Sequence, residues 1–280
     1  MHKNFSFIRS SHITPTLFFL AAMLLSAPNQ TQAAQTQNNS VEPTTQTIEY
    51  KSGQANLEGF LATPKAPSTK KLSAMLIVHD WMGIGEFTKN KAKLLASQGF
   101  VAMAVDVYGK DNLPKNSDEA AKLSGKLKED RALLRSRIRA AYDVVAKNAN
   151  VDRSKIFVMG YCFGGTTALE LARSGAELRG TISFHGGLST PTPQDAKQIK
   201  GPVLALHGAD DPYVSTAEVE AFKKEMKDAN VSLQFISYPG AVHAFTNPAA
   251  GDDPKKGAAY QKAADEKSWI DFNEFMKNKI

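Results

Sequence analysis

Short apolar runs alternate with longer amphipathic segments along most of this chain. Residues 72–79 and 100–105 are almost continuously apolar, a pattern typical of strands that are buried on both faces of a sheet. Between them, residues 88–97 have the composition of a helix, which we expect to stop at Gly99. This alternation predicts a mostly parallel sheet with helices on both faces, that is, an α/β fold.

The alternation continues to the C-terminus. A hairpin is expected around Gly53, and residues 108–127, which contain Gly, Pro, Asn and Asp before a short helical pattern, are a candidate lid. The other expected strands are at 47–51, 57–62, 155–159, 178–184, 202–207 and 232–238, and the other expected helices at 129–148, 166–172, 215–228 and 258–276. We find no internal repeat and no inter-domain linker, so residues 47–280 should form a single domain.

The N-terminal segment has a different composition. Residues 1–33 combine a basic start, an apolar core at 16–25 and a best cleavage site at 31–33. These features predict a secretory signal peptide, with an uncleaved anchor as the alternative. Residues 34–46 are rich in Gln, Thr and Asn and are predicted to form a disordered tether. We expect export to a bacterial periplasm, with secretion as the alternative.

The remaining chain has the size of one large α/β domain. Removing residues 1–33 leaves 280 − 33 = 247 residues, and the loss of Lys3 and Arg9 lowers the formal net charge from +6 to +4. The other lysines are scattered, so no nucleic-acid partner is expected. No later stretch is long and apolar enough to cross a membrane, so we expect no stable membrane insertion once the signal is removed.

Cys162 is the only cysteine of the chain, and it lies in the sequence GYCFGG at residues 160–165. A Gly-x-nucleophile-x-Gly turn between a strand and a helix lifts the reactive atom to the top of a sheet. Such a turn also places the thiol at a helix N-terminus, which favours the thiolate. A lone cysteine in an exported protein cannot form an internal disulfide. We therefore predict that Cys162 is a nucleophile, the alternative being a small buried hydrophobic residue.

Two later loops supply a base for the thiol and an orienter for that base. Asp211 lies in a turn after the strand at 202–207, and His243 lies in a loop after the last strand. The order nucleophile, acid, histidine is that of α/β-hydrolases. In this arrangement Asp211 fixes the tautomer of His243, and His243 exchanges a proton with the thiol and the leaving group. The alternatives are a turn or helix-capping aspartate and a solvent-exposed loop histidine.

The other polar residues near strand ends are expected to have lesser roles. Asp210 is expected to be a cap or a surface residue, and His79, His185 and His207 are expected to be structural or to line a pocket. No pair of histidines lies at ligand spacing on one helix or loop, so we predict no metal site and no cofactor.

Five motifs together resemble the dienelactone hydrolase family, a branch of the α/β-hydrolases. They are HDWMG at 79–83, DVYG at 106–109, GYCFGG at 160–165, HGADD at 207–211 and GAVHAF at 240–245. The resemblance extends from about residue 47 to the last helix and implies an α/β-hydrolase fold. It also implies that Cys162, Asp211 and His243 form the catalytic triad. The backbone N–H groups of Trp81 and Phe163 would then form the oxyanion hole.

The chain departs from the best-known members of this family at two places. Asp80 stands where those members have a glutamate that helps to switch the thiol to its reactive form, so Asp80 is a candidate for gating the thiol. No arginine occurs between residues 108 and 129, and Asn247 stands where a second carboxylate-binding arginine is expected. Three lysines are candidates to replace these arginines as point charges: Lys110, Lys115 and Lys122. Candidate pocket walls are Trp81, Met82, Tyr108 and Phe245, the alternative for the aromatic residues being ordinary core.

The resemblance therefore implies a cofactor-independent hydrolase that cleaves a small carboxylic ester or lactone through a thioester on Cys162. The departures make the dienelactone itself a disfavoured substrate. One alternative is an exported, non-catalytic binding protein on a hydrolase fold. Others are a redox or thiol-transfer role, which lacks a resolving cysteine, and serine-like peptidase chemistry. The sequence indicates no oligomeric state.

Overall fold

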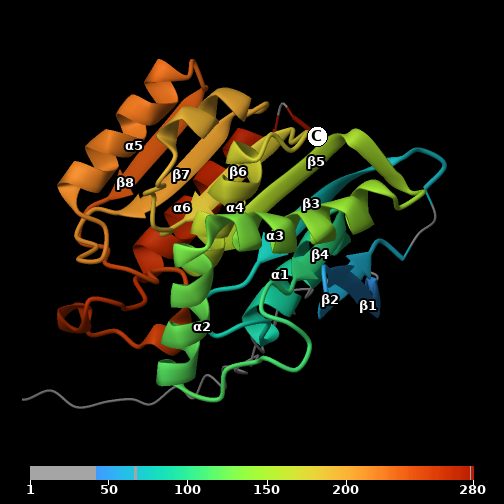
Figure 1. Cartoon of the computed structure of the whole chain (residues 1–280), viewed down its shortest axis with the longest axis horizontal. Helices are drawn as coiled ribbons and strands as arrows, with labels where there is room; N and C mark the ends of the chain where they lie inside the picture. The colour runs from blue at the N-terminus through green and yellow to red at the C-terminus, as the bar shows by residue number, and fades with distance from the viewer. Residues whose placement is uncertain (1–41, 66–67, 278) are drawn as a thin grey trace, which may run out of the picture. The chain divides into compact units, whose positions relative to one another are not determined.

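A mostly parallel sheet forms the centre of the computed structural model, which describes residues 42–65, 68–277 and 279–280 (Figure 1). The signal peptide predicted for residues 1–33 lies outside the described residues. The strands are β1 (Thr44–Ser52), β2 (Ala55–Thr63), β3 (Leu72–Val78), β4 (Val101–Val105), β5 (Val151–Tyr161), β6 (Gly180–Phe184), β7 (Val203–Gly208) and β8 (Leu233–Tyr238). Their order in the sheet is β1-β2-β4-β3-β5-β6-β7-β8. The pairs β1–β2 and β2–β4 are antiparallel, and the pairs from β4 to β8 are parallel.

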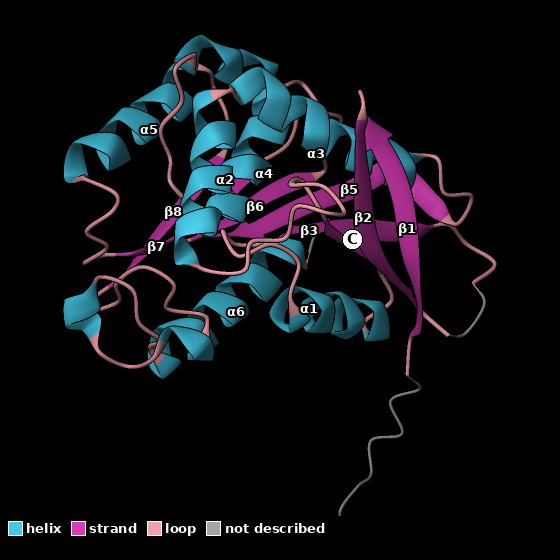
Figure 2. Ribbon diagram, turned by 60° about the horizontal axis from the view of Figure 1, so that its bottom comes forward, coloured by secondary structure: helices cyan, strands magenta, loops and turns pink. Residues whose placement is uncertain are grey.

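Helices cover both faces of this sheet (Figure 2). On one face lie α1 (Glu86–Ser97) and α6 (Lys262–Met276), and on the other lie α3 (Arg131–Ala146), α4 (Phe163–Arg173) and α5 (Thr216–Asp228). Helix α2 (Ser117–Glu129) lies on the same side as α3 and α4. Three short 3₁₀ helices complete the loops: η1 (Pro193–Gln198), η2 (Pro248–Ala250) and η3 (Pro254–Lys256). The predicted α/β fold class is confirmed.

The central strands β3 and β4 are almost entirely apolar because they face a helical layer on each side. Along β3, Leu76 packs in the core on the α3–α4 side, which includes Leu171 of α4. Its neighbour Ile77 packs in the core on the α1–α6 side, which includes Leu95 of α1. Since successive side chains of a strand point to opposite faces, both sets must be apolar.

Two predicted boundaries at the N-terminal half differ from the structure. Strand β1 begins at Thr44, which pairs with Thr63, so residues 44–46 form strand and not the end of a tether. A polar sequence is compatible with an exposed edge strand, whose backbone pairing does not depend on side-chain polarity. The predicted helix at 129–148 is interrupted at Asp130, which ends α2 and caps α3 by accepting a hydrogen bond from the Leu133 amide.

The final helix begins at Lys262, four residues later than the predicted start at Ala258. The amide of Ala259 donates to the carbonyl of His243 at 3.0 Å, and the amide of Gln261 donates to the carbonyl of Phe245 at 3.1 Å. Residues 258–261 are therefore extended because their backbone pairs with the loop that carries His243. Within the part of the chain that the structure describes, none of the helices has the length and hydropathy needed to span a bilayer.

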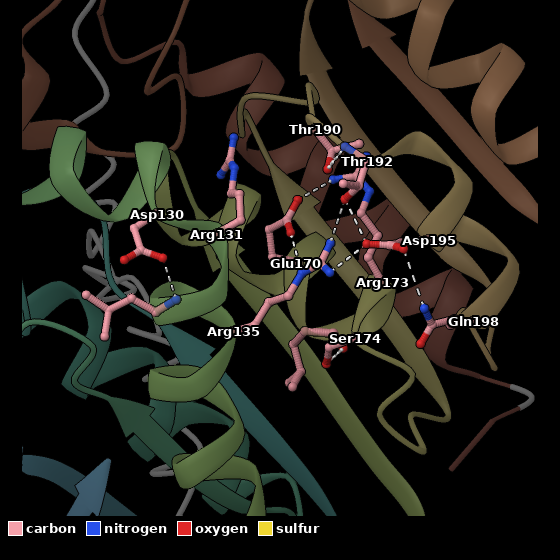
Figure 3. Close-up of polar contacts among 12 residues, drawn as sticks. Asp130, Arg131, Arg135, Glu170, Arg173, Ser174, Thr190, Thr192, Asp195 and Gln198 are labelled. Atoms are coloured by element: carbon pink, nitrogen blue, oxygen red, sulfur yellow. Dashed lines mark hydrogen bonds and ion pairs between the residues drawn. The ribbon is translucent and has the colours of Figure 1, made fainter. Parts of the chain in front are cut away.

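A buried network of ion pairs holds α4 in place, and Figure 3 shows its members Arg135, Glu170, Arg173 and Asp195. The fully buried Arg173 donates to Glu225 of α5 through Nε and Nη2, both at 2.8 Å, and to Glu170 through Nη1 at 3.1 Å. Glu170 also accepts from Arg135 of α3 at 2.8 Å, and Arg135 donates to Asp195 of η1 at 2.6 Å. These charges compensate one another and connect α3, α5 and η1 to α4, the helix that follows the candidate nucleophile.

Candidate active site

The candidate site residues follow the carboxyl ends of parallel strands. His79 comes directly after β3, Cys162 after β5, Asp211 after β7 and His243 after β8. The carboxyl ends of parallel strands lie at one edge of a sheet, and open α/β sheets bind ligands there. Side chains more than 160 residues apart in the sequence are therefore gathered in one place.

Cys162 lies on a sharp turn between β5 and α4. Its φ of 55° and ψ of −119° place a non-glycine residue in a rarely populated region, at a cost on the order of 1–3 kcal/mol. A Cβ atom at Gly160 would lie 2.0 Å from the carbonyl oxygen of Gly164. A Cβ atom at Gly164 would lie 2.4 Å from the carbonyl oxygen of Val78. Both flanking glycines are thus required by close backbone contacts, as the motif predicts.

The structure brings the side chains of Cys162, Asp211 and His243 into one hydrogen-bonded line. His243 Nε2 lies 2.9 Å from Cys162 Sγ, and His243 Nδ1 lies 2.8 Å from Asp211 Oδ2. Because an ionised carboxylate only accepts, Nδ1 carries a proton and Nε2 faces the sulfur. The other oxygen of Asp211 accepts from the Tyr213 amide at 2.9 Å. Asp211 therefore fixes its own turn and the imidazole together.

Charge and hydrogen bonding favour the protonated imidazole. Burial alone lowers the pKa of His243, but its hydrogen bonds to Asp211 and Cys162 and the charges of both groups outweigh burial and raise the pKa to about 10. A proton shared between Sγ and Nε2 is therefore stabilised on the nitrogen. The arrangement can supply a thiolate beside an imidazolium, which is the pair needed for nucleophilic attack.

A second histidine lies beside this pair and stays neutral. The ring of His185 makes an edge contact with the ring of His243, with centroids 5.3 Å apart. Burial, and then the charge of His243, lowers the pKa of His185 well below its ordinary value. The Cys162 amide donates to His185 Nδ1 at 3.2 Å, so the proton of His185 is on Nε2, which faces Thr246 Oγ1 at 2.8 Å. His185 thus supports the candidate nucleophile without adding a competing cation.

The backbone of His243 is held on both sides by the segment before α6. Its amide donates to the carbonyl of Gly257 at 3.1 Å, and its carbonyl accepts from the amide of Ala259 at 3.0 Å. The ring of Tyr213 makes an edge contact with the imidazole, with centroids 5.3 Å apart. His243 is therefore fixed in a defined orientation, and its side chain is only 13% exposed.

The amides of Trp81 and Phe163 are placed as potential oxyanion donors. Phe163 is the first residue of α4, where a helical amide has no acceptor within the helix. Trp81 lies in a turn in which the Asp80 carbonyl accepts from the Gly83 amide at 3.3 Å. Among the described residues, neither the Trp81 nor the Phe163 amide donates to a protein acceptor, and both residues line the same cavity.

A cavity of about 630 Å³ opens over the sulfur of Cys162. Its wall includes Asp80, Trp81 and Met82 from the loop after β3; Trp81 and Met82 are two of the candidate pocket walls selected from the sequence. One carboxylate oxygen of Asp80 accepts a hydrogen bond from the Met82 amide at 2.8 Å. This bond holds the Asp80 side chain against the turn that follows β3. The predicted lid, residues 108–127, contributes Ser117 and Ser124 of α2 to the wall, and Lys128 follows on the same helix.

Two of the predicted pocket residues are not on this wall. Tyr108 is 3% exposed and its ring packs behind the wall, against the rings of His79 and Phe163. Phe245 is fully buried and packs against the rings of His185 and Tyr238. The prediction that these aromatic residues line the pocket is wrong, because both belong to the layer that supports it.

The lysines singled out from the sequence do not reach the cavity either. Lys110 pairs with Glu49 and with Glu58 on the edge hairpin, and neither Lys115 nor Lys122 belongs to the cavity wall. The lysine on the wall is Lys128, near the C-terminal end of α2. Sequence reasoning missed it because the boundary between α2 and α3 was not recognised. Asn247, by contrast, does line the cavity.

Other wall residues were also missed. Tyr213 and Thr246 line the cavity, each within three residues of a predicted triad member, and Thr166 lines it from the first turn of α4. Their positions next to Asp211, His243 and Cys162 were the available signal. Among residues 42–65, 68–277 and 279–280, no three His, Cys, Asp or Glu side chains form a group able to hold a metal ion.

Comparison with known proteins agrees with this geometry. The model of the dienelactone hydrolase family matches residues 57–280. The chain belongs to the dienelactone hydrolase family. It is thus a carboxymethylenebutenolidase-like hydrolase that acts on ester bonds. An Aquifex aeolicus protein provisionally named a carboxymethylenebutenolidase is 31% identical over 218 residues, which cover 75% of this chain and 92% of that protein.

Two other similar proteins have names that describe further activities. A Bradyrhizobium protein provisionally named a 2-oxo-3-(5-oxofuran-2-ylidene)propanoate lactonase is 30% identical over 196 residues, which cover 66% of this chain and 77% of that protein. The crystal structure of a dienelactone hydrolase-like promiscuous phosphotriesterase from metagenomic libraries superposes with a TM-score of 0.80. It is 32% identical and covers 85% of this chain and 99% of its own.

Proposed function

We propose that this dienelactone hydrolase family member cleaves a carboxylic ester or lactone of a small molecule through a thioester on Cys162. The observation that supports this most strongly is the line from Asp211 through His243 to Cys162, with the sulfur at the wall of a cavity. The names of the carboxymethylenebutenolidase and lactonase relatives are consistent with esters and lactones as substrates.

In the first step, the proton of Cys162 Sγ is on His243 Nε2 and the thiolate attacks the carbonyl carbon of the substrate. A C–S bond forms, and the carbonyl electron pair moves to the oxygen. The amides of Trp81 and Phe163 donate to that oxyanion, and by comparison with other oxyanion holes each donor lowers the barrier by about 3 kcal/mol.

In the second step, the tetrahedral intermediate collapses and the C–O bond to the leaving group breaks. His243 Nε2 gives its proton to the departing oxygen, which leaves as an alcohol, or as a tethered hydroxyl if the substrate is a lactone. The product is a thioester on Cys162. Asp211 holds the imidazole in place through Nδ1 during both transfers.

In the third step, His243 takes a proton from water and the resulting hydroxide attacks the thioester. The same two amides hold the oxyanion again. Collapse expels the Cys162 thiolate and releases the carboxylic acid, and the proton remains on His243 Nε2. The site has then returned to the thiolate–imidazolium pair, so one water is consumed in each turnover.

Turnover of p-nitrophenyl acetate tests this proposal against a non-catalytic binding protein on the same fold. We expect the parent to turn over and Cys162→Ala to lose activity by a factor on the order of 10⁴ or more. Iodoacetamide should abolish activity, and because Cys162 is the only cysteine, alkylation reports on this residue alone. A parent that binds the ester without turnover, or a Cys162→Ala variant with parental kcat, would contradict the proposal.

A further inference from the structure

Tyr108 contacts both residues whose amides we assign to the oxyanion hole. Its hydroxyl donates to the carbonyl oxygen of Trp81 at 2.9 Å. Its ring stacks on the ring of Phe163, with centroids 5.5 Å apart and planes inclined by 25°. Trp81 and Phe163 come from different elements, the loop after β3 and the start of α4. Tyr108 is the side chain that connects them behind the cavity wall.

We propose that Tyr108 is a positioning residue that sets the direction and spacing of the Trp81 and Phe163 amides. The inference rests on the proposed function, because it concerns the oxyanion formed during ester cleavage. Tyr108 does not line the cavity, so it acts through the two residues that do.

The loop that carries Trp81 needs an anchor of this kind. The Trp81 side chain is 37% exposed, so its own packing holds the loop weakly. The peptide that bears the Trp81 amide is held at its other end, where His79 Nδ1 and the Gly83 amide both contact the Asp80 carbonyl. The next carbonyl, that of Trp81, is held by Tyr108. Rotation of the amide is therefore restricted from both sides.

Tyr108 is itself rigidly mounted. Its amide donates to Asp106 Oδ1 at 2.7 Å, and its carbonyl accepts from Arg137 Nη1 at 3.0 Å. The ring of His79 packs against its ring with centroids 4.7 Å apart. The position of the hydroxyl is thus fixed by packing in the core, and the side chain is not free to change rotamer as an exposed one would be.

The hydroxyl remains a donor throughout the reaction. Burial, and then the charge of Cys162, raises the pKa of Tyr108 well above its ordinary value, so the proton stays on the oxygen. Since the amides act on an oxyanion that exists only near the transition state, misplacing them affects kcat and leaves KM nearly unchanged.

The test compares Tyr108→Phe with Tyr142→Phe. Tyr142 is a matched control, because its hydroxyl also donates to a backbone carbonyl, that of Glu177 at 3.2 Å, and it does not line the cavity. For p-nitrophenyl acetate, Tyr108→Phe should lower kcat about 10- to 100-fold, as expected for small misplacements of catalytic groups. KM and the rate of alkylation by iodoacetamide should stay at parental values, since alkylation forms no oxyanion. Tyr142→Phe should leave all three unchanged.

A second variant keeps the test decisive if Tyr108→Phe does not fold. Phe163→Leu removes the ring contact with Tyr108 and keeps the Phe163 amide, and it should lower kcat with an unchanged rate of alkylation. Parental kcat in the variant that folds, or an equal fall in its alkylation rate, overturns the positioning role. If Cys162→Ala also keeps parental turnover, the proposed function fails as well. If Cys162→Ala is inactive, only the role of Tyr108 is lost.

Discussion

The contribution of His243 to the stability of the fold depends on pH. Hydrogen bonds and charges from Asp211 and Cys162 raise its pKa from 6.5 to about 10 in the folded protein. A raised pKa means that folding favours the protonated imidazole. The stabilisation is fully present below pH 6.5 and is lost as the pH rises through about 10, where the imidazole is neutral in both states.

Urea unfolding of the parent and of His243→Gln at several pH values checks this linkage. The difference in free energy of unfolding between the two proteins should shrink as the pH rises from 6.5 to about 10. Cys162→Ser keeps the hydrogen bond between His243 and Asp211 but removes the sulfur, one of the two groups that raise the pKa of His243. In this variant, the pH range over which the stabilisation is lost should therefore be lower. A difference that is constant over this range would show that the imidazole is not held in its protonated form.

Lys128 is the residue through which the cavity could favour anionic substrates. It lies on the cavity wall and is exposed, and an exposed ion pair typically contributes 0.2–1 kcal/mol. Lys128→Met should therefore raise KM for an ester that carries a carboxylate by a factor of about 1.4 to 5. KM for neutral p-nitrophenyl acetate should not change. Lys122→Met, on the same helix but off the wall, is the control. Equal effects of both variants would exclude the contact.

Among single residues, the sequence identified the three side chains that the structure brings into one hydrogen-bonded line better than it identified the residues around them. Cys162 is unique and flanked by glycines, and Asp211 and His243 follow strands, so spacing alone was informative. Tyr108 and Phe245 were assigned to the pocket wrongly, because an aromatic residue beside a motif suits a buried support as well as a wall. Whether such an aromatic side chain lines the pocket or supports its wall depends on how the neighbouring helices and strands pack.

Among the elements, α4 depends on charges that do not line the cavity. Glu225 on α5 pairs with the fully buried Arg173, whereas Glu220 on the same helix pairs with Lys223 at the surface. Removing one partner of a buried pair leaves an uncompensated charge, so Glu225→Gln should lower the free energy of unfolding by about 3–5 kcal/mol. Glu220→Gln should change it by less than about 1 kcal/mol. Equal urea midpoints for the two variants would contradict this account of the ion pair between Glu225 and Arg173.

The start of a helix was predictable from the sequence where a capping residue marks it, and was not predictable where it depends on pairing with a distant segment. Helix α5 begins after Ser215, whose side chain accepts from the Glu218 amide, and the sequence placed this start within one residue. The start of α6 was placed four residues too early, since residues 258–261 are extended by pairing with a loop that is distant in sequence. Local composition does not contain that information.

For the whole molecule, alternating apolar runs were sufficient to predict the fold class, and the family match agrees with it. The order of the strands was not predictable from periodicity, because it depends on which crossovers pack together. Export also stays a prediction, since residues 1–33 lie outside the described structure. The mass of the protein purified from its source would test it, with cleavage after residue 33 expected and a retained N-terminus contradicting it.

The central claim is that the reaction passes through an acyl group on one sulfur. Intact-protein mass spectrometry after rapid acid quenching of the parent with p-nitrophenyl acetate tests this directly. We predict a mass increase of one acetyl group that maps to Cys162, is removed by hydroxylamine and is absent from Cys162→Ala. Steady turnover with no acetyl group on Cys162, or with the acetyl group on another residue, would contradict the account.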